Sequence, residues 1–365
     1  MKTALFPVGI TPTKFLTPTH VKGILQIDLY RRLLMVSGHV DLIYNRRIWD
    51  SSLQTLHLWN QLNQTESGRS FETTSDLEIS KLYSLASKAK PVDISPRRAL
   101  QERVVRDGYI HPVSIRITEI WAQQLSRIGI DSDFLSTSQP LTPFDTVLDE
   151  IRRCSYLLDY DAIGGGAYLD MTDQNFALRQ LRSKTGEYNY LVPMISVVRQ
   201  LTISYERVIL CCDISVTRDF QLLQKMFETK DTKLELKLIN RVSLDGRDLS
   251  SKEGIPYRFS FAQSIEPFFH DYTRADIRLG LLLYFLHAIP PKGGRDFNQE
   301  ELAEQIALAA TVLEKLGEYS HPDDALHPQL RKRIDRLDYF GILSLLKSSK
   351  TEIYLKRQIA GVLLS

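Results

Sequence analysis

The first 44 residues constrain the fold most, because they read in succession as a strand, a helix and a second strand. An apolar run occupies residues 4–10, and a turn rich in Thr and Pro follows at 11–20. Apolar positions then recur at helical spacing from Gly23 to Val36, and Gly38 is a typical helix stop. A second apolar run, Val40–Tyr44, comes directly after it. This β-loop-α-β pattern indicates a parallel sheet and an α/β fold.

The rest of the chain repeats the strand–helix–strand pattern only once, near its middle. Strand patterns occupy 207–213 and 234–242, with a helical pattern at 218–228 between them. The segment before this second unit is a polar connection followed by helical patterns, at 61–78, 79–89, 112–128 and 143–158. From Phe261 onward almost the whole sequence has helical periodicity.

We therefore predict an α/β fold whose parallel sheet is split by a mainly helical insertion and followed by a C-terminal helical bundle. The first half of the sheet domain is predicted at 1–60 and the insertion at 61–190. The second half is predicted at 191–258 and includes a candidate functional loop at 245–254. The bundle is predicted at 259–365.

Composition excludes several classes of protein. The 365 residues carry 46 Lys+Arg against 44 Asp+Glu, a formal charge of +2, which disfavours a long nucleic-acid track. The three cysteines do not form a disulfide framework and indicate a reducing compartment. The longest apolar stretch, Leu279–Ile289, is about half the roughly 20 residues that a membrane span needs. Since no signal peptide is evident either, we expect a soluble cytoplasmic protein without a membrane partner.

The opening turn is the most informative segment for function. A turn from a strand into a helix exposes backbone N–H groups at the helix start, and these suit a phosphate group. His20 lies at this point and could donate a hydrogen bond to a nucleotide phosphate. The segment matches neither GxGxxG nor a Walker A loop, so the residues alone favour the interpretation of His20 as a polar residue at a helix entry over a phosphate contact.

Motifs in order along the chain resemble class I aminoacyl-tRNA synthetases, in particular the cysteinyl branch and its relative, the mycothiol-pathway cysteine ligase. The first signature corresponds to Val8-Gly9-Ile10-Thr11-Pro12, Thr17-Pro18-Thr19-His20, Asp28, Arg31-Arg32, Gly38-His39, Asn45 and Asp50. Later matches are Gly166-Ala167-Tyr168-Leu169-Asp170, the segment 245–254, Ala275–Leu282 and Arg295–Asn298. The resemblance implies that the split parallel sheet is Rossmann-like, of the HUP type, and that it carries an ATP site.

The resemblance also implies which residues would bind ATP-Mg²⁺. Along the first signature these are Gly9, Thr11, Thr17, Thr19 and His20, of which Thr17 and Thr19 replace a His and a Gly of the family motif. In the second signature they are Ser250, Ser251 and Lys252.

The second signature departs from the family motif at both of its lysines, which fall on Asp248 and Ser251. Lys252 lies one position beyond and is either a substitute phosphate cation or a solvated loop lysine. We predict His20 and Lys252 as the catalytic residues.

Zinc and a cysteine substrate are not expected. Val8 stands where the family has its leading zinc-ligating Cys, and Cys211 and Cys212 are adjacent in a strand, so that they point to opposite faces. We therefore predict no metal ligands. Val8, together with Asn45 and Asp50 at the carboxyl edge of the second strand, is predicted to contact the substrate.

Three functions remain open on the sequence alone. The first is a ligase that converts an amino acid or similar carboxylate and ATP into an acyl-adenylate, and passes the acyl group to a small-molecule amine without tRNA. The second is a catalytically silent descendant that serves as a binding or scaffold subunit for a protein partner. The third is a shortened synthetase that charges tRNA through its terminal helices, which the balanced charge disfavours.

Overall fold

A parallel sheet of four strands forms the centre of the molecule. The computed structural model describes residues 2–7, 9–89, 95–247, 255–288, 296–317 and 326–364. The strands run in the order β2-β1-β6-β7, all parallel, with bounds β1 Thr3–Phe6, β2 Val40–Leu42, β6 Arg207–Asp213 and β7 Lys233–Ile239. Thr3 on β1 is level with both Val40 and Arg207. The prediction of an α/β fold with a split parallel sheet is confirmed.

Helix α1, Pro18–Ser37, connects β1 to β2 and begins five residues before the apolar periodicity becomes visible. Its start is marked by Pro18 at the first helical position, where a missing N–H costs nothing, and its end by Gly38. Most of its residues are buried, polar ones included, because the helix has the sheet on one side and the C-terminal helices on the other. A helix buried on nearly all sides shows no clean amphipathic stripe, which explains the late onset of the pattern.

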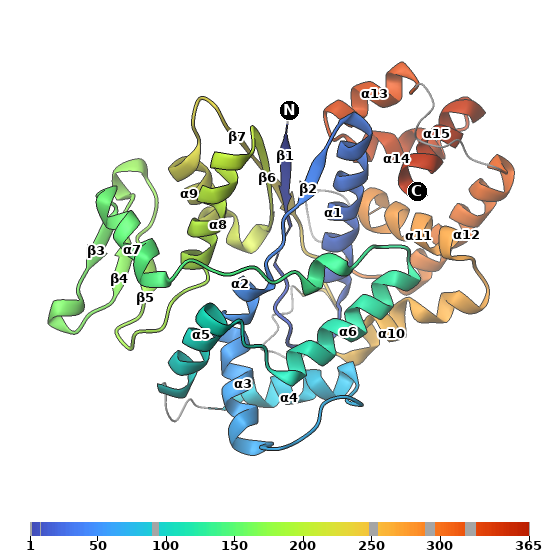
Figure 1. Cartoon of the computed structure of the whole chain (residues 1–365). Helices are drawn as coiled ribbons and strands as arrows, with labels where there is room; N and C mark the ends of the chain where they lie inside the picture. Colours follow the sequence, from blue (N-terminus) through green and yellow to red (C-terminus); the bar gives the residue numbers. More distant parts are fainter. Residues whose placement is uncertain are drawn as a thin grey trace.

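Helices cover both faces of the sheet (Figure 1). Helices α8, Leu191–Ser204, and α9, Thr217–Phe227, pack on β6 and on each other, and α9 also packs on β7. Helix α1 covers the opposite face, and the C-terminal helices pack behind it. This is the layered arrangement that a parallel sheet requires, because both of its faces are apolar.

The insertion between β2 and α8 is helical in its first part. Its helices are α2 Arg46–Asp50, α3 Leu53–Thr65, α4 Asp76–Lys88, α5 Ser95–Asp107, α6 Pro112–Arg127 and α7 Phe144–Arg153. Since α3 extends to Thr65 and α4 starts at Asp76, the connection predicted at 61–78 is shorter at both ends.

A small antiparallel sheet, which the periodicity did not indicate, completes the insertion. It consists of β3 Leu157–Asp159, β4 Ala167–Leu169 and β5 Arg179–Arg182. The helix predicted at 143–158 is therefore wrong in its last residues: α7 stops at Arg153, and Ser155 takes a left-handed φ of 62° that no helix continues through.

The C-terminal region is a bundle of helices, as predicted. Its longer members are α11 Arg274–Leu282, which continues as a π-helix to Ala288, α12 Gln299–Leu316, α13 Pro328–Asp335, α14 Tyr339–Lys347 and α15 Ile353–Leu364. Helices α11 and α12 touch at Gly280, where an added Cβ would lie 2.6 Å from Ile306 Cα. Among the residues described, no helix combines the length and the apolar character that crossing a membrane demands.

A buried charge cluster joins the bundle to the sheet domain. The Arg278 side chain on α11 is 3% exposed and forms an ion pair with Asp28 of α1. It also donates hydrogen bonds to the carbonyl oxygens of Leu363, at 3.0 Å, and Ile128, at 3.3 Å. Arg32 donates to the same Asp28 carboxylate at 2.9 Å. One side chain thus ties together α1, α15 and the end of α6.

Candidate functional site

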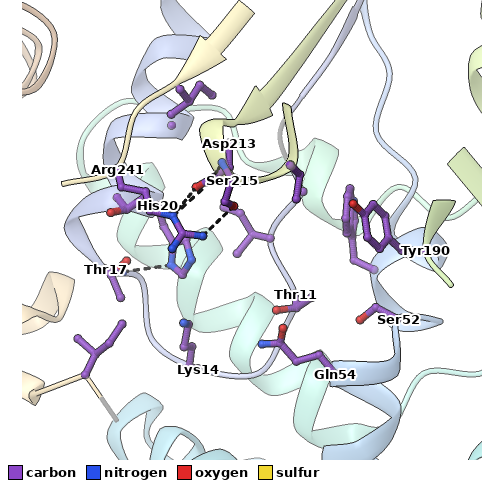
Figure 2. A pocket seen from close by; sticks show the side chains of 18 of the residues that line it. Thr11, Lys14, Thr17, His20, Ser52, Gln54, Tyr190, Asp213, Ser215 and Arg241 are labelled. Carbon is purple, nitrogen blue, oxygen red and sulfur yellow. Dashed lines mark hydrogen bonds and ion pairs between the residues drawn. The ribbon is translucent and has the colours of Figure 1, made fainter. Parts of the chain in front are cut away.

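A cavity of about 610 Å³ opens at the carboxyl edge of the parallel sheet. Its walls come from the segments that follow β1, β6 and β7 and from the start of α1, which is where open α/β sheets bind ligands. The lining includes every predicted ATP-binding residue of the first signature: Gly9, Thr11, Thr17, Thr19 and His20. Figure 2 shows the side chains around this cavity.

His20 is held as a neutral hydrogen-bond donor. Its Nδ1 accepts the backbone N–H of Thr17 at 3.3 Å, which satisfies a free donor at the helix start. Burial, reinforced by the charges of Lys14 and Arg241, lowers the pKa of His20 to about 3. A neutral ring that accepts at Nδ1 carries its proton on Nε2. The ring also has a hydrogen bond with the Phe15 backbone, which offsets part of this lowering of the pKa. His20 therefore adds no charge at neutral pH, and Nε2–H is the donor that it can present to a ligand.

Lys14 is the residue that sequence reasoning missed. It lies within the opening turn, six residues before His20, and lines the cavity with only 7% of its surface exposed. No carboxylate or other hydrogen-bonding partner contacts its ammonium group in the part of the chain that the structure describes. Burial and the Arg241 guanidinium lower the pKa of Lys14 to about 8. A buried cation without a counter-ion is costly and marks a place for an anion.

Arg241 brings a second cation to the cavity from the segment after β7. Its Nε lies 3.2 Å from both carboxylate oxygens of Asp213, and its Nη2 donates to Ser215 Oγ at 2.9 Å. Figure 2 shows the His20 ring between the side chains of Arg241 and Lys14. Since Asp213 neutralises Arg241, the positive charge of Lys14 remains in excess.

Thr19 ties the start of α1 to the segment that follows β7. Its Oγ1 accepts the Val242 N–H at 3.0 Å and donates to the Val242 carbonyl at 3.4 Å. Leu244 and Ile255, on either side of the second signature, both line the cavity. The predicted residues Ser250, Ser251 and Lys252, and also Asp248 and Val8, lie outside the described residues.

An aromatic wall closes the cavity on the side away from His20. The rings of Trp49 and Tyr190 are nearly parallel, at an angle of 29° and a centroid distance of 6.4 Å. The Trp49 indole lies directly against the backbone of Gly9, where an added Cβ would be 1.9 Å from Trp49 Cζ2. Gly9 is therefore required for space at this point, because any side chain would displace the indole.

Replacing Gly9 with alanine is expected to lower the free energy of unfolding by about 1–3 kcal/mol, the usual effect of overpacking. Chemical denaturation monitored by tryptophan fluorescence measures the change. In a Trp49→Ala background the same substitution should cost clearly less, because the clashing ring is gone. An equal cost in both backgrounds would contradict the role assigned to Gly9.

Asn45 and Asp50, both predicted to contact substrate, do not line the cavity. The Asn45 side chain caps α2 by accepting the Arg47 N–H at 3.2 Å, and it donates to the Gln139 carbonyl at 3.0 Å. Asp50 is fully buried, its pKa is raised by that burial, and it accepts from Arg46 Nε at 2.9 Å. Both residues hold the short helix that carries Trp49. Direct substrate contact at these positions stays a prediction.

The two adjacent cysteines belong to the interior of β6. Cys211 and Cys212 are completely buried, and burial raises the pKa of Cys212 to about 12 and that of Cys211 as well. Their thiols are therefore protonated at neutral pH. In the described ranges, no group of three or more His, Cys, Asp or Glu side chains is arranged to hold a metal ion.

Comparison with known proteins gives structural matches only. No family model and no curated protein matches the chain. The arginyl-tRNA synthetase of Thermus thermophilus superposes with a TM-score of 0.57 at 14% identity, over 99% of this chain and 73% of that one. The Plasmodium falciparum enzyme gives 0.55 at 11% identity, over 100% and 74%.

A third match covers nearly all of both chains. A Campylobacter jejuni protein assigned as an arginyl-tRNA synthetase gives a TM-score of 0.55 at 13% identity, over 100% of this chain and 90% of that one. Identities this low establish the fold alone, and the cysteinyl branch indicated by the motifs stays a prediction. The chain has the fold of the class I aminoacyl-tRNA synthetases.

Proposed function

We propose that the chain is a class I synthetase-like ligase that activates an amino acid with ATP and transfers it to a small-molecule amine. The observation that carries this proposal is the ammonium group of Lys14, which has no partner among the described residues and lies beside His20 at the carboxyl edge of the sheet. A triphosphate supplies the anion that this arrangement lacks. An inert scaffold would have no reason to keep a buried cation facing a cavity.

The described residues fit ATP-Mg²⁺ in a particular way. Lys14, Arg241 and the His20 ring line the cavity where the triphosphate would lie, and the positive end of the α1 dipole adds to their attraction for phosphate. Asp213 is the only carboxylate among the described lining residues, and Arg241 already engages it. The magnesium ion would therefore be held mainly by phosphate oxygens and water. When bound, it neutralises charge on the phosphates.

The proposed chemistry consists of two displacements. In the first, a carboxylate oxygen of the amino acid attacks the α-phosphorus of ATP, the bond to the β-phosphate oxygen breaks, and pyrophosphate leaves. In the second, an amine attacks the acyl carbon, AMP leaves, and the amine loses a proton as the amide forms. Lys14 and His20 stabilise the charge that builds up on the phosphates in the first step.

A small amine is the proposed acceptor because exposed arginines of the insertion are already paired with carboxylates. On the insertion, Arg152 pairs with Asp149 and Asp159, and Arg182 pairs with Asp159 and Asp161. Arginines that carboxylates already neutralise contribute little to binding an RNA backbone. The three free cysteines fit the reducing cytoplasm, where we propose the protein acts.

Substitution of His20 tests the first step. With ATP-Mg²⁺, the twenty standard amino acids and hydroxylamine as a trap, the wild-type protein should release AMP and form a hydroxamate. His20→Asn retains an acceptor for the Thr17 N–H but removes the Nε2 donor, and should slow AMP release about 100-fold or more. His20→Ala should do the same and also lose about 1 kcal/mol of stability, since the helix start loses its acceptor. Wild-type turnover in His20→Asn would exclude the proposed role.

Two outcomes would point to the other functions. If saturating ATP-Mg²⁺ does not raise the unfolding temperature, no nucleotide binds to the folded state, and a silent scaffold with a protein partner becomes the better account. If RNA binding is tight and falls steeply with salt, the acceptor is a tRNA.

A further inference from the structure

We infer that the amino acid activated in this cavity has an uncharged, flat side chain, either aromatic or carboxamide, which lies against Trp49 and Tyr190 and, where it carries an oxygen, accepts a hydrogen bond from Asn189. The inference rests on the proposed function and names its substrate class. It differs from what the fold neighbours would lead one to expect, because the three solved structures above are arginyl enzymes.

The charges of the cavity disfavour a cationic side chain. The described lining contains two cations, Lys14 and Arg241, and one carboxylate, Asp213, which already accepts from Arg241. Lys14 and Arg241 are the cations proposed for the ATP phosphates, so a guanidinium or ammonium group of the substrate would find no free carboxylate among the described lining residues. Burial of such a group without a counter-ion is strongly unfavourable.

The acid nearest the aromatic wall is not available either. The Tyr190 hydroxyl donates to Asp219, which also accepts from Arg179 Nη2 at 2.7 Å. Asp219 is buried and does not belong to the cavity lining. The negative charge of Asp219 is thus already paired, and Tyr190, not Asp219, lines the cavity.

The shape of the wall favours a flat group. Trp49 and Tyr190 present two nearly parallel rings, and Gly9 fixes the indole by letting it lie on the backbone. Leu53, Val216 and Phe220 complete an apolar surface around them. Planar side chains gain most from such surfaces, because ring faces and amide planes stack on them.

Asn189 supplies the polar contact. Its Oδ1 accepts the Leu191 N–H at 3.1 Å, so this oxygen is already used at the start of α8. Asn189 lines the cavity, and its amide nitrogen has no hydrogen-bond partner among the residues described. A free N–H₂ group calls for an acceptor, such as a phenol or carboxamide oxygen on the ligand.

The test uses aminoacyl-sulfamoyl adenosines, which are stable mimics of the adenylate. Dissociation constants are measured with the full chain for the tyrosyl, tryptophanyl, phenylalanyl and glutaminyl compounds and for the arginyl, lysyl and glutamyl compounds, with ATP-Mg²⁺ as a separate ligand. We expect the tightest binder to be one of the first four, and the arginyl and lysyl compounds to bind at least tenfold more weakly than it.

Asn189→Asp provides the matched variant. An aspartate oxygen can still accept the Leu191 N–H, while the second oxygen gives the cavity the free carboxylate that it lacks. The variant should bind the arginyl compound about 10- to 100-fold more tightly than wild type, and the preferred neutral compound more weakly. Asn189→Ser, which adds no charge, should not gain arginyl binding.

The outcomes separate the inference from the proposed function. If ATP-Mg²⁺ and some compounds bind but the arginyl, lysyl or glutamyl compound binds best, the inference is wrong and the ligase proposal stands. If Asn189→Asp unfolds at the wild-type denaturant concentration and gains no affinity for the arginyl compound, the side chain of the bound amino acid does not lie at Asn189. The inference then also fails. If neither ATP-Mg²⁺ nor any compound binds, both the ligase proposal and the inference about its substrate are wrong.

Discussion

Replacing Lys14 with methionine is expected to weaken ATP-Mg²⁺ binding about 10- to 100-fold, since a hydrogen bond to a charged group contributes about 1.5–3 kcal/mol. Methionine fills a similar volume and is compatible with a buried site. Because the substitution removes a buried, unpaired charge, the protein without ligand should be as stable as wild type or more so. Isothermal titration calorimetry gives the affinity, and denaturation gives the stability.

The same contact predicts how affinity depends on pH. With the pKa of Lys14 lowered to about 8, the ammonium group is fully charged at pH 7 and largely neutral by pH 9. ATP affinity should therefore fall as the pH rises through about 8. In the folded protein Lys14 binds fewer protons than its unfolded counterpart between pH 8 and 10.5, so its own contribution to stability improves over that interval.

Two further variants complete this test. Lys14→Arg keeps a charge that does not titrate below pH 12, so the fall in affinity above pH 8 should disappear. Lys252→Met removes the lysine that the motif analysis named. If Lys252→Met abolishes ATP binding while Lys14→Met leaves it intact, the phosphate cation belongs to the second signature, and the role assigned to Lys14 is wrong.

Substitution of Asp28 by asparagine is expected to lower the free energy of unfolding by about 3–5 kcal/mol. Arg278 is almost completely buried, and loss of its carboxylate leaves a charge in the interior with only carbonyl oxygens as partners. Urea denaturation with the wild-type slope would measure the change.

The control for this prediction is Asp131→Asn, which breaks an ion pair between the side chains of Asp131 and Arg31 that are 55% and 31% exposed. Its cost should stay within about 0.5 kcal/mol. The double variant Asp28→Asn with Arg278→Met should recover part of the loss, since an apolar side chain needs no counter-ion. A loss below 1 kcal/mol in Asp28→Asn alone would contradict the structural role assigned to this buried ion pair.

Much of the fold could be predicted because its strands and helices repeat simple patterns. The strand predicted at 207–213 coincides with β6, and α9 differs from its prediction by one residue at each end. The sheet β3–β5 was not predicted, because strands of three or four residues are too short to show alternation of apolar and polar residues.

The site was predictable only where it coincides with a motif. Residues along the opening turn indeed line one cavity, because a strand end and a helix start meet there. Lys14 was overlooked because it lies between the two blocks of the motif, and no spacing rule reports that a lysine will be buried without a partner.

The position of a residue at the sheet edge did not predict whether its side chain faces the cavity. Asn45 and Asp50 lie near the correct edge, yet their polar atoms form hydrogen bonds with Gln139 and Arg46. Which way a side chain points depends on packing partners far away in the sequence. Tyr190 and Asn189, which do face the cavity, follow an insertion of more than a hundred residues.

The long insertion also sets the order in which the molecule can assemble. Strand β1, Thr3–Phe6, needs β6 as its second neighbour, and residues 207–210 of β6 leave the ribosome about 200 residues later. Until then β1 lacks the neighbour that covers its second edge, while the helices of the insertion have already been synthesised. Pairing over so long a separation is slow, and open strand edges attract other chains. The nascent protein is thus most exposed to aggregation during synthesis of its middle third, and chaperones have most to protect at that stage.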